Sequence, residues 1–539
     1  MGAGVGAARR RRGTTAGLFG VVLLVATTVL TSGGAHAQPS PSPSGRTAGQ
    51  GEDEDRDGKK GDHGKGTGKP KPGETGTTRP GEPSATTGPT TGTAATAPGR
   101  TPSGSGSPAA RPVPTVGTVL ASAEAGSAAA VPTGTGLQQA LAAALGDKNL
   151  GTVTVAVADA ASGQLLYGSG ENTPATPAST TKLATSVAAL SLLPADTRLT
   201  TRVVKGAGPG EITLVGGGDP TLTALPADQV QIGGQPVDAD TAPASLDALA
   251  KQTAAALKAD GTTTVKLDYD LSLYNGDPKH KNHDAQNIAL VVPLMVDEGK
   301  ADPKSREEAP NRVADPADQA AESFAALLKA QGITVEGKAK PATAPAAATA
   351  AVLGRVDSPT IARLVERLLT NSDNQLAEAI ARQVAIAAHQ PASFEGAAAA
   401  VVKELTKLGV PMSGVSLNDG SGLHPGNAIP PVVLVHLLSL AASEQHPTLR
   451  PVITGLPIAG FTGTLGKRFG SGSGAADAAG LIRAKTGTLS GVNTLAGTVV
   501  DAEGRLLAFA VMTRTAAPAD TARAAMDRIV ARLTTCGCH

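Results

Sequence analysis

The chain has few aromatic residues and almost no net charge. Its 539 residues include six Phe, three Tyr and no Trp, and the formal net charge is +1. Without aromatic platforms for base stacking, or a positive field to attract phosphates, nucleic-acid binding is not expected. The hydrophobic cores must be built mainly from Ala, Val, Leu and Ile. The length allows two or more domains.

Cysteine is also scarce. The chain has only Cys536 and Cys538, in the terminal Cys-Gly-Cys-His. An oxidising compartment would allow a short-loop disulfide between them. His539 could join them in a metal site, but no fourth ligand is evident from the sequence. We expect a frayed or locally oxidised terminus, and no metal or other cofactor.

The N-terminal residues predict export. Arg9 to Arg12 provide a positive region, an apolar run follows from about 16 to 30, and Ala35-His36-Ala37 offers a cleavage site. The apolar run is shorter than the roughly 20 residues that a membrane-spanning helix needs. We interpret residues 1–37 as a signal peptide. If it stays uncleaved, it would associate the protein with a membrane, and in either case the remaining chain would work outside the cytoplasm.

Residues 38–134 are rich in Pro, Gly, Ser and Thr and contain few large apolar residues. Such a composition cannot bury enough apolar surface to offset the loss of chain entropy on folding. We predict a long disordered linker, which could act as a spacer or as a passive solvated tether.

Hydrophobic patterning predicts an α+β fold. Both ends of the ordered region contain a helix and strands, which suggests one antiparallel sheet closed by both termini. The expected strands are 152–158, 165–167, 481–488, 493–500 and 506–513, and the expected helices are 136–145 and 519–533. A mostly helical stretch from 358 to 443 would form the partner lobe. Pro177 suits the first turn of a further helix, which would run to a stop at Pro194.

The middle of the chain has a different pattern. Short β-branched runs alternate with helical segments, and they predict an inserted α/β domain at 198–343. Its expected strands include 211–215 and 262–267, and its expected helices are 246–259 and 315–331. The catalytic domain would then consist of residues 135–197 and 344–539.

Ser179-Thr180-Thr181-Lys182 is the only Ser-x-x-Lys motif in the chain. On a helix, Lys182 lies one turn from Ser179 and on the same side. A serine hydroxyl needs a nearby base to become a nucleophile, and a lysine can be that base if burial or a neighbouring positive charge lowers its pKa. Lys485 could supply such a charge. The alternative is an ordinary helix start with a surface lysine.

Ser372-Asp373-Asn374 falls between two expected helices, 361–370 and 375–387. A bend there can point polar side chains into a cleft between lobes. The alternative for Ser372 is a helix N-cap. Ser416-Leu417-Asn418 has the same pattern but lies in a loop rich in Gly, Pro and Ser.

Lys485-Thr486-Gly487 occurs once, on an expected strand. A strand edge can pair with a peptide, and Gly487 would let the peptide backbone come close. Lys485 and the hydroxyls of Thr486 and Thr488 suit a carboxylate. A polar edge strand is the alternative for this motif alone. The three motifs in order make a serine acyl-transfer site the preferred interpretation.

The chain therefore resembles the penicillin-recognising serine enzymes. It is most similar to the D-alanyl-D-alanine carboxypeptidases and endopeptidases among the class C penicillin-binding proteins, because the first two motifs lie far apart in the sequence. Leu214–Leu222, Asp419–Leu423 and Leu456–Gly460 also look like signatures of this family. The resemblance covers about 135–533 and implies a two-lobed fold like that of serine β-lactamases and transpeptidases.

The resemblance also implies roles for the motif residues. Ser179 would form an acyl-enzyme and Lys182 would activate it. Ser372 would pass a proton to the leaving amine, Asn374 would hold the substrate amide, and Lys485 would support Ser372. The residues expected to bind the substrate are Thr486, Gly487 and Thr488.

The implied substrates are peptidoglycan stem peptides, and β-lactams would act as covalent inhibitors. The enzyme would reside in the cell wall or on the outer face of the bacterial cytoplasmic membrane. One alternative is a non-catalytic envelope module that binds wall peptides, although such a module would not require Lys182. A β-lactamase is a further alternative, and the motif spacing disfavours it.

Overall fold

The computed structural model describes residues 129–284, 286–307 and 309–539. The predicted signal peptide and all but the last residues of the predicted linker lie outside the described residues. Within the described ranges, no helix is long and apolar enough to cross a membrane.

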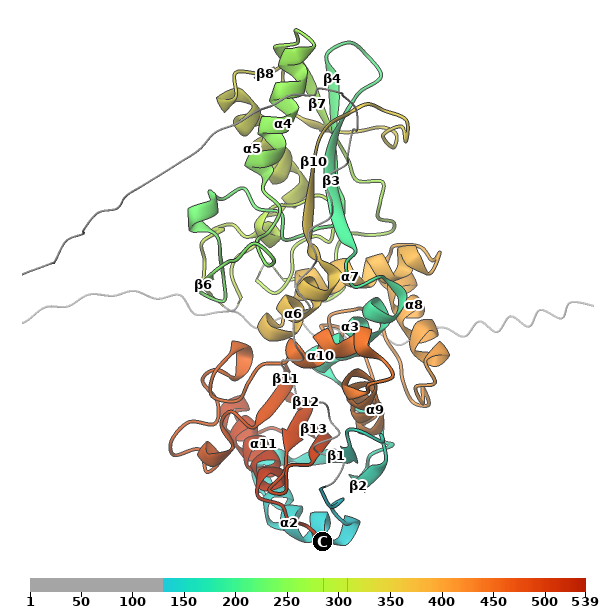
Figure 1. The fold of residues 1–539 in the computed structure, drawn as a ribbon, viewed down its shortest axis with the longest axis vertical. Helices are drawn as coiled ribbons and strands as arrows, with labels where there is room; N and C mark the ends of the chain where they lie inside the picture. Colours follow the sequence, from blue (N-terminus) through green and yellow to red (C-terminus); the bar gives the residue numbers. More distant parts are fainter. Residues whose placement is uncertain (1–128, 285, 308) are drawn as a thin grey trace, which may run out of the picture. The chain divides into compact units, whose positions relative to one another are not determined.

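A five-stranded antiparallel sheet joins the two ends of the described chain (Figure 1). Its order is β11–β12–β13–β1–β2. The strands are β1 (Thr152–Asp159), β2 (Leu165–Ser169), β11 (Ile482–Leu489), β12 (Val492–Val500) and β13 (Leu506–Arg514). The centre of the sheet is the pair β1 and β13, in which Thr152 lies opposite Arg514 and Asp159 opposite Leu507. The predicted sheet is confirmed.

Side-chain size divides the two faces of this sheet. On β1, Val155 and Val157 face one core, whereas Ala156 and Ala158 face the other. β13 repeats the pattern, because Leu507 and its alternate neighbours join the first core and three smaller or unbranched residues join the second. The larger residues pack under the terminal helices α2 (Gly134–Leu145) and α11 (Ala519–Thr534). The alanine face lets the helical lobe approach closely, which brings that lobe to the edge strand β11.

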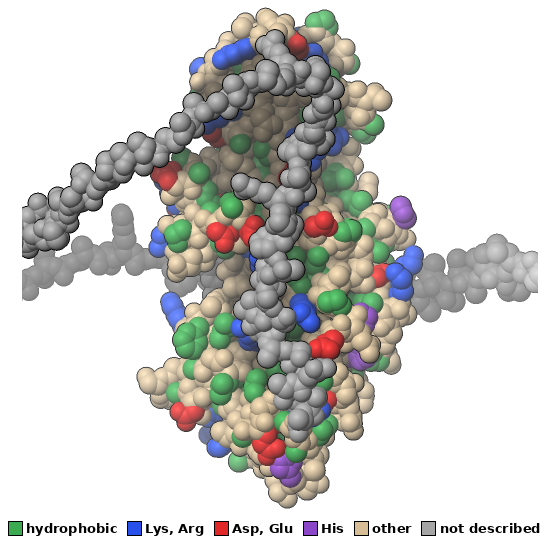
Figure 2. All heavy atoms as spheres, viewed as in Figure 1, with side chains coloured by type: hydrophobic (Ala, Val, Ile, Leu, Met, Phe, Trp, Pro, Cys, Tyr) green, Lys and Arg blue, Asp and Glu red, His purple; other side chains and the backbone are tan. Residues whose placement is uncertain are grey.

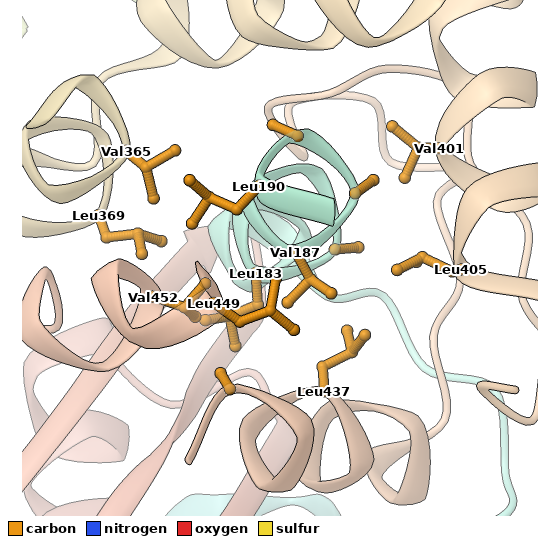
Figure 3. Packing of buried hydrophobic residues seen from close by; sticks show 14 of the residues in the cluster. Leu183, Val187, Leu190, Val365, Leu369, Val401, Leu405, Leu437, Leu449 and Val452 are labelled. Carbon is orange, nitrogen blue, oxygen red and sulfur yellow. The ribbon is translucent and has the colours of Figure 1, made fainter. Parts of the chain in front are cut away.

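The helical lobe is built around α3 (Thr181–Leu192). Ten consecutive residues of α3, from Thr181 to Leu190, are buried, as expected for a helix surrounded on all sides. Figure 3 shows Leu183, Val187 and Leu190 of α3 pointing toward side chains of the surrounding helices. Those helices are α6 (Ile361–Asn371), α7 (Asn374–Ala387), α8 (Phe394–Lys407), α9 (Pro431–Ala442) and α10 (Arg450–Thr454). The predicted helical partner lobe is confirmed.

A second, mixed sheet occupies the middle of the chain. Its order is β10–β3–β4–β7–β8, and β9 also pairs with β7. Its strands are β3 (Arg198–Lys205), β4 (Glu211–Val215), β7 (Thr264–Asp270), β8 (Thr334–Val335), β9 (Lys340–Pro341) and β10 (Val352–Thr360). The helices α4 (Leu246–Ala259) and α5 (Pro316–Ala330) share one hydrophobic core with this sheet. A short hairpin, β5 (Gln231–Ile232) and β6 (Gln235–Pro236), lies between β4 and α4 in the sequence.

The last strand of this second sheet differs from the sequence analysis. β10 pairs with β3, with Val352 opposite Val204 and Thr360 opposite Arg198. The sequence analysis ended the inserted segment at 343 and assigned residues 344–360 to the catalytic domain. Alternation alone could not reveal that β10 returns to the second sheet before α6 begins, because register is a property of the pairing.

The C-terminus is anchored, so the expectation of fraying was wrong. Cys536 is buried and forms a disulfide with Cys538. The carbonyl of Cys538 accepts a hydrogen bond of 2.7 Å from the backbone N–H of Thr133, next to α2. His539 contacts the carboxylate of Glu503 at 2.5 Å. Local oxidation of the terminus, the other expectation, agrees with the structure.

The packing around α3 predicts a stability difference between two leucines. Leu437 is fully buried in the core of Figure 3, whereas Leu481 is 47% exposed. We expect Leu437→Ala to lower the free energy of unfolding by about 2–5 kcal/mol, because it leaves a cavity. Leu481→Ala should change it by less than about 1 kcal/mol. Urea unfolding of both variants followed by circular dichroism tests this, and equal losses would contradict the described packing.

Candidate active site

Ser179 lies in a tight turn directly before α3. The turn is the 3₁₀ helix η2 (Ala178–Thr180), and its preceding carbonyl, that of Pro177, accepts hydrogen bonds from the Thr180 backbone N–H at 3.1 Å and from Thr494 Oγ1 at 2.8 Å. Ala178 has a φ of 47°, which is unusual for a residue with a side chain. Backbone strain of this kind is common at functional sites. The turn presents Ser179 at the end of the buried helix, where the sequence analysis expected a helix start.

Lys182 is a fully buried lysine within contact of Ser179. Its Nζ lies 2.9 Å from Ser179 Oγ, 2.7 Å from Asn374 Oδ1 and 2.7 Å from the carbonyl oxygen of Ser421. These three acceptors come from η2, α7 and a loop, so the amine is fixed from three directions. The alternative of a surface lysine is wrong.

The environment of Lys182 favours its neutral form. Burial lowers the pKa of Lys182 from 10.5 to about 8, although the carboxylates of Asp419, Glu378 and Asp373 oppose the shift. The sequence analysis offered either burial or the charge of Lys485 as the cause. Burial is the largest cause in the structure, because α3 is enclosed by the helical lobe.

Ser372, Asp373 and Asn374 form the bend between α6 and α7. Ser372 has left-handed backbone angles, φ 58° and ψ 34°, and ends α6. The N-cap of α7 is Asp373, which accepts a 3.0 Å hydrogen bond from the Leu376 N–H, so the alternative of Ser372 as an N-cap is wrong. Asn374 begins α7 and donates from Nδ2 to the carbonyl of Asn287 at 3.2 Å. The reversal at Ser372 turns its hydroxyl toward β11.

Asp373 is held by a buried ionic cluster. Burial and the nearby Glu298 raise the pKa of Asp373 to about 6. Glu298 pairs with Arg367 on α6 and, at 2.8 Å, with Lys300. The middle segment of the chain thus contacts the Ser372 bend through Glu298 as well as through Asn287.

Lys485 connects β11 to this bend. It is fully buried, and its Nζ lies 2.8 Å from Ser372 Oγ and 2.8 Å from the Thr486 carbonyl oxygen. The Lys485 and Lys182 amines therefore each contact one motif serine. Lys485 is the second cation that the sequence predicted. It lies beside Ser372, the proposed proton relay, and is buried, not exposed at the strand edge.

Gly487 is required by a close approach of β11 to the Ser179 turn. A Cβ at Gly487 would lie 2.1 Å from Thr494 Oγ1, 2.8 Å from the Pro177 carbonyl oxygen and 3.0 Å from the Ser179 backbone nitrogen. Only glycine fits here. The sequence analysis proposed the approach of a peptide backbone as the reason, whereas the atoms that exclude a side chain in the structure belong to Thr494 on β12 and to the protein's own Ser179 turn. The backbone of β11 is thereby placed next to the N–H of Ser179.

The two threonines of this strand line the cleft and have polar partners. Thr486 Oγ1 lies 2.7 Å from Thr464 Oγ1, and Thr488 Oγ1 accepts a 3.0 Å hydrogen bond from Arg523 Nη2. Earlier along β11, the backbone is paired with the segment around Ala459, whose N–H donates to the Ile482 carbonyl at 3.0 Å. The family-like segment Leu456–Gly460 thus covers the first part of this strand edge.

A cleft of about 2310 Å³ contains the exposed members of the site. Of the predicted site residues, six line it: Ser179, Ser372, Asn374, Thr486, Gly487 and Thr488. Lys182 and Lys485 lie behind them, fully buried. The structure therefore brings all eight predicted residues together around one cleft. The cleft is large enough for a peptide.

Sequence reasoning missed several groups. The carbonyl of Ser421, a partner of Lys182, is a backbone atom, and its only sequence signal was the family-like segment Asp419–Leu423. No signal pointed to Thr464 or Arg523, which reach the cleft from the 3₁₀ helix η6 (Gly463–Leu465) and from α11.

His280, Glu378 and Asp419 form a buried group of possible metal ligands, with ligand atoms within 4.8 Å of one another. Their atoms already have other partners: Asp419 Oδ2 lies 2.9 Å from His280 Nε2, and Glu378 Oε1 accepts from the Ser421 N–H at 2.8 Å. The group has the hydrogen bonding of a structural network, and a metal would have to displace it.

Comparison with known proteins identifies the family. The model of the D-Ala-D-Ala carboxypeptidase 3 (S13) family matches residues 137–312 and 302–534. Carboxypeptidase DacB of Mycolicibacterium smegmatis is 37% identical over 420 residues, covering 76% of this chain and 86% of that protein. The D-alanyl-D-alanine carboxypeptidase of Actinomadura sp. is 29% identical over 440 residues, covering 70% of this chain and 80% of that protein.

The fold is similar to that of a protein whose crystal structure has been solved. Penicillin binding protein 4 from Haemophilus influenzae has a TM-score of 0.57 at 21% identity, covering 74% of this chain and 98% of that chain. The two-lobed fold that the resemblance implied is confirmed. The chain belongs to the D-Ala-D-Ala carboxypeptidase 3 (S13) family. It is a serine D,D-peptidase of the carboxypeptidase class.

The contacts of Gly487 predict the effect of adding one methyl group there. We expect Gly487→Ala to reduce the rate of acylation by a β-lactam at least 100-fold, because the new Cβ would displace either β11 or the Ser179 turn. Gly470→Ala is a suitable control, since a Cβ at Gly470 meets no heavy atom within 4 Å. Stopped-flow acylation kinetics measure both, and a normal rate for Gly487→Ala would contradict the described approach.

Proposed function

We propose that Ser179 is the nucleophile of this D,D-peptidase and that Lys182 is its general base. The supporting observation is the 2.9 Å contact between Lys182 Nζ and Ser179 Oγ at a fully buried amine. Because burial lowers its pKa to about 8, about one Lys182 in ten is neutral at pH 7 and able to accept a proton.

The first half-reaction forms an ester. Ser179 Oγ attacks the carbonyl carbon of the penultimate D-Ala while its proton passes to Lys182 Nζ. The negative charge on the carbonyl oxygen is stabilised by the backbone N–H groups of Ser179 and Thr488. The C–N bond then breaks, and the departing D-Ala amine takes a proton through Ser372 Oγ, which contacts Lys485 Nζ.

The second half-reaction restores the enzyme. A water molecule attacks the ester carbonyl, its proton is accepted by a basic group of the site, and Ser179 leaves with a proton as the free hydroxyl. No redox step is involved, and the protein's own residues supply each proton transfer.

Three cleft residues would orient the substrate. Asn374, held between Lys182 and the Asn287 carbonyl, donates to or accepts from the substrate amide. The hydroxyls of Thr486 and Thr488 bind the terminal carboxylate. The edge of β11 pairs with the extended peptide, as in other strand-addition complexes.

The proposed substrates are peptidoglycan stem peptides that end in D-Ala-D-Ala, or the D-Ala crosslinks between such stems. β-Lactams would acylate Ser179 as covalent inhibitors; a solved structure of the Haemophilus influenzae protein is described as complexed with a β-lactam. Incubation with a pentapeptide muropeptide and with a crosslinked dimer, followed by mass spectrometry, separates the two activities. Release of D-Ala from the monomer alone would define a carboxypeptidase.

We propose that the enzyme works outside the cytoplasm, in the cell wall or on the outer face of the bacterial cytoplasmic membrane, where its proposed substrate lies. We further propose that residues 1–37 are the export signal, that 38–134 are a linker, and that the catalytic domain is divided by an inserted domain. Assigning β10 to the insertion, because of its pairing with β3, moves the end of that domain from 343 to about 360.

The nucleophile assignment predicts loss of labelling in one serine variant. A fluorescent penicillin should label the wild type covalently, and Ser179→Ala should show no label, because the attacking oxygen is absent. Ser439→Ala, which removes another buried serine hydroxyl of the helical lobe, should label normally. Gel fluorescence measures this, and labelled Ser179→Ala would disprove the assignment.

The base assignment predicts a pH dependence. Only neutral Lys182 accepts a proton, so the acylation rate constant should rise with pH and reach half of its maximum near pH 8. Lys182→Met should lose at least 1,000-fold in rate at every pH. Its non-covalent binding of the β-lactam should equal that of Ser179→Ala, which serves as the reference for an intact cleft. A wild-type rate that is constant between pH 6 and 9 would contradict the proposed base.

A further inference from the structure

Behind Lys182, on the side away from the cleft, lie two buried carboxylates that the reaction steps do not use. Glu378 on α7 is fully buried, and Asp419, at the start of the loop Asp419–Leu423, is 1% exposed. Neither residue lines the cleft. Buried carboxylates are unfavourable unless their oxygens are hydrogen-bonded, so their partners indicate what they hold in place.

Glu378 binds the backbone of the loop that contacts Lys182. Its Oε1 accepts from the Ser421 N–H at 2.8 Å, and both of its oxygens lie 3.1 Å from the Gly420 nitrogen. The carbonyls of the same two residues point to α3: Gly420 O accepts from Thr185 Oγ1, and Ser421 O accepts from Lys182 Nζ, each at 2.7 Å. Glu378 therefore holds the N–H groups of the two residues whose carbonyls contact α3, and one of these carbonyls, that of Ser421, contacts the Lys182 amine.

The loop is closed by Asp419 and His280. Asp419 accepts from the backbone N–H groups of Gly422 at 2.9 Å and His424 at 2.7 Å, and from His280 Nε2 at 2.9 Å. His280 Nδ1 in turn accepts a 3.0 Å hydrogen bond from the Asn282 N–H, which fixes the ring beside Asp419. The loop is thus rigid on both flanks, and Glu378 is its link to the helix that also carries Asn374.

The carboxylates around Lys182 all raise its pKa. Asp419, Glu378 and Asp373 all favour the ammonium form, in that order of size, against the effect of burial. His280 Nε2 lies 2.9 Å from Asp419 Oδ2, and Lys485, the other cation of the site, contacts Ser372. Burial and the neighbouring Asp419 raise the pKa of Glu378, while its hydrogen bonds from Ser421 and Gly420 oppose that rise and favour the carboxylate. A proton arriving from Ser179 creates a positive charge on Lys182 Nζ, which ionised carboxylates stabilise.

We propose that Glu378 is a positioning residue for the reaction: through Gly420 and Ser421 it holds the carbonyl that fixes Lys182 Nζ against Ser179 Oγ, and its charge stabilises the ammonium formed there. The proposal rests on the proposed role of Lys182 as the base. The two contributions, charge and hydrogen bonding, are separable by substitution.

Two variants separate them. Glu378→Gln removes the charge but keeps the length of the side chain, and we expect the midpoint of the acylation pH profile to move down by about one unit, with a lower maximum rate. Glu378→Asp keeps the charge but is too short to reach both N–H groups. We expect it to keep the wild-type midpoint and to lose about 10-fold in maximum rate.

The matched control is Glu404→Gln, which removes another buried carboxylate of the helical lobe. Glu404 on α8 accepts from Ser191 Oγ at 2.7 Å and is not among the charges that act on Lys182. This variant should keep both the midpoint and the rate. Circular dichroism melting of all variants compares their folding, so that kinetics are read only from folded protein.

The outcomes distinguish this proposal from the proposed function. An unchanged midpoint in folded Glu378→Gln, or an equal shift in Glu404→Gln, would overturn the role of Glu378. The pH dependence of the wild type would still support Lys182 as the base. If Glu378→Gln does not fold, Glu378→Asp decides: an unchanged rate would overturn the role. A wild type that shows no pH-dependent acylation would instead contradict the function of Lys182 itself.

Discussion

The structure of the site depends on the burial of one amine beside one hydroxyl. Lys182 is enclosed because α3 runs through the middle of the helical lobe, and that enclosure lowers its pKa enough for a lysine to serve as a base near neutral pH. The same enclosure requires acceptors for its protons, which Ser179, Asn374 and the Ser421 carbonyl provide. A surface lysine at the same spacing would remain charged and would not accept the serine proton.

The convergence of three distant motifs follows from the two-faced sheet. Small side chains on one face of β1 and β13 admit the helical lobe closely, whereas larger ones on the other face pack under α2 and α11. β11 is the edge strand of that sheet, so Gly487 meets the Ser179 turn and Lys485 meets the α6–α7 bend. The alanines of these strands therefore contribute to the site, because they allow the close packing that brings the motifs together.

Much of the fold was predictable because it depends on local patterns. Periodicity identified α4, β4 and the strands of the first sheet, and motif order predicted eight residues that the structure brings together around one cleft. Properties that arise only from pairing were not predictable, such as the return of β10 to the second sheet and the anchoring of Cys538 against α2. Residue type does not reveal the left-handed backbone angles of Ser372 or the role of the Ser421 carbonyl. The contacts of Arg523 and Thr464 form only when α11 and the segment before β11 pack against the sheet.

The most direct test is to titrate Lys182 itself in the absence of any substrate. Protein labelled with ¹³C at the lysine ε-carbons, with the Lys182 signal assigned by its absence from Lys182→Arg, would be followed by NMR between pH 6 and 11. The buried environment predicts a midpoint of about 8 for this one signal. A midpoint near 10.5, the ordinary value for a lysine, would contradict the view that burial prepares Lys182 to take the proton of Ser179.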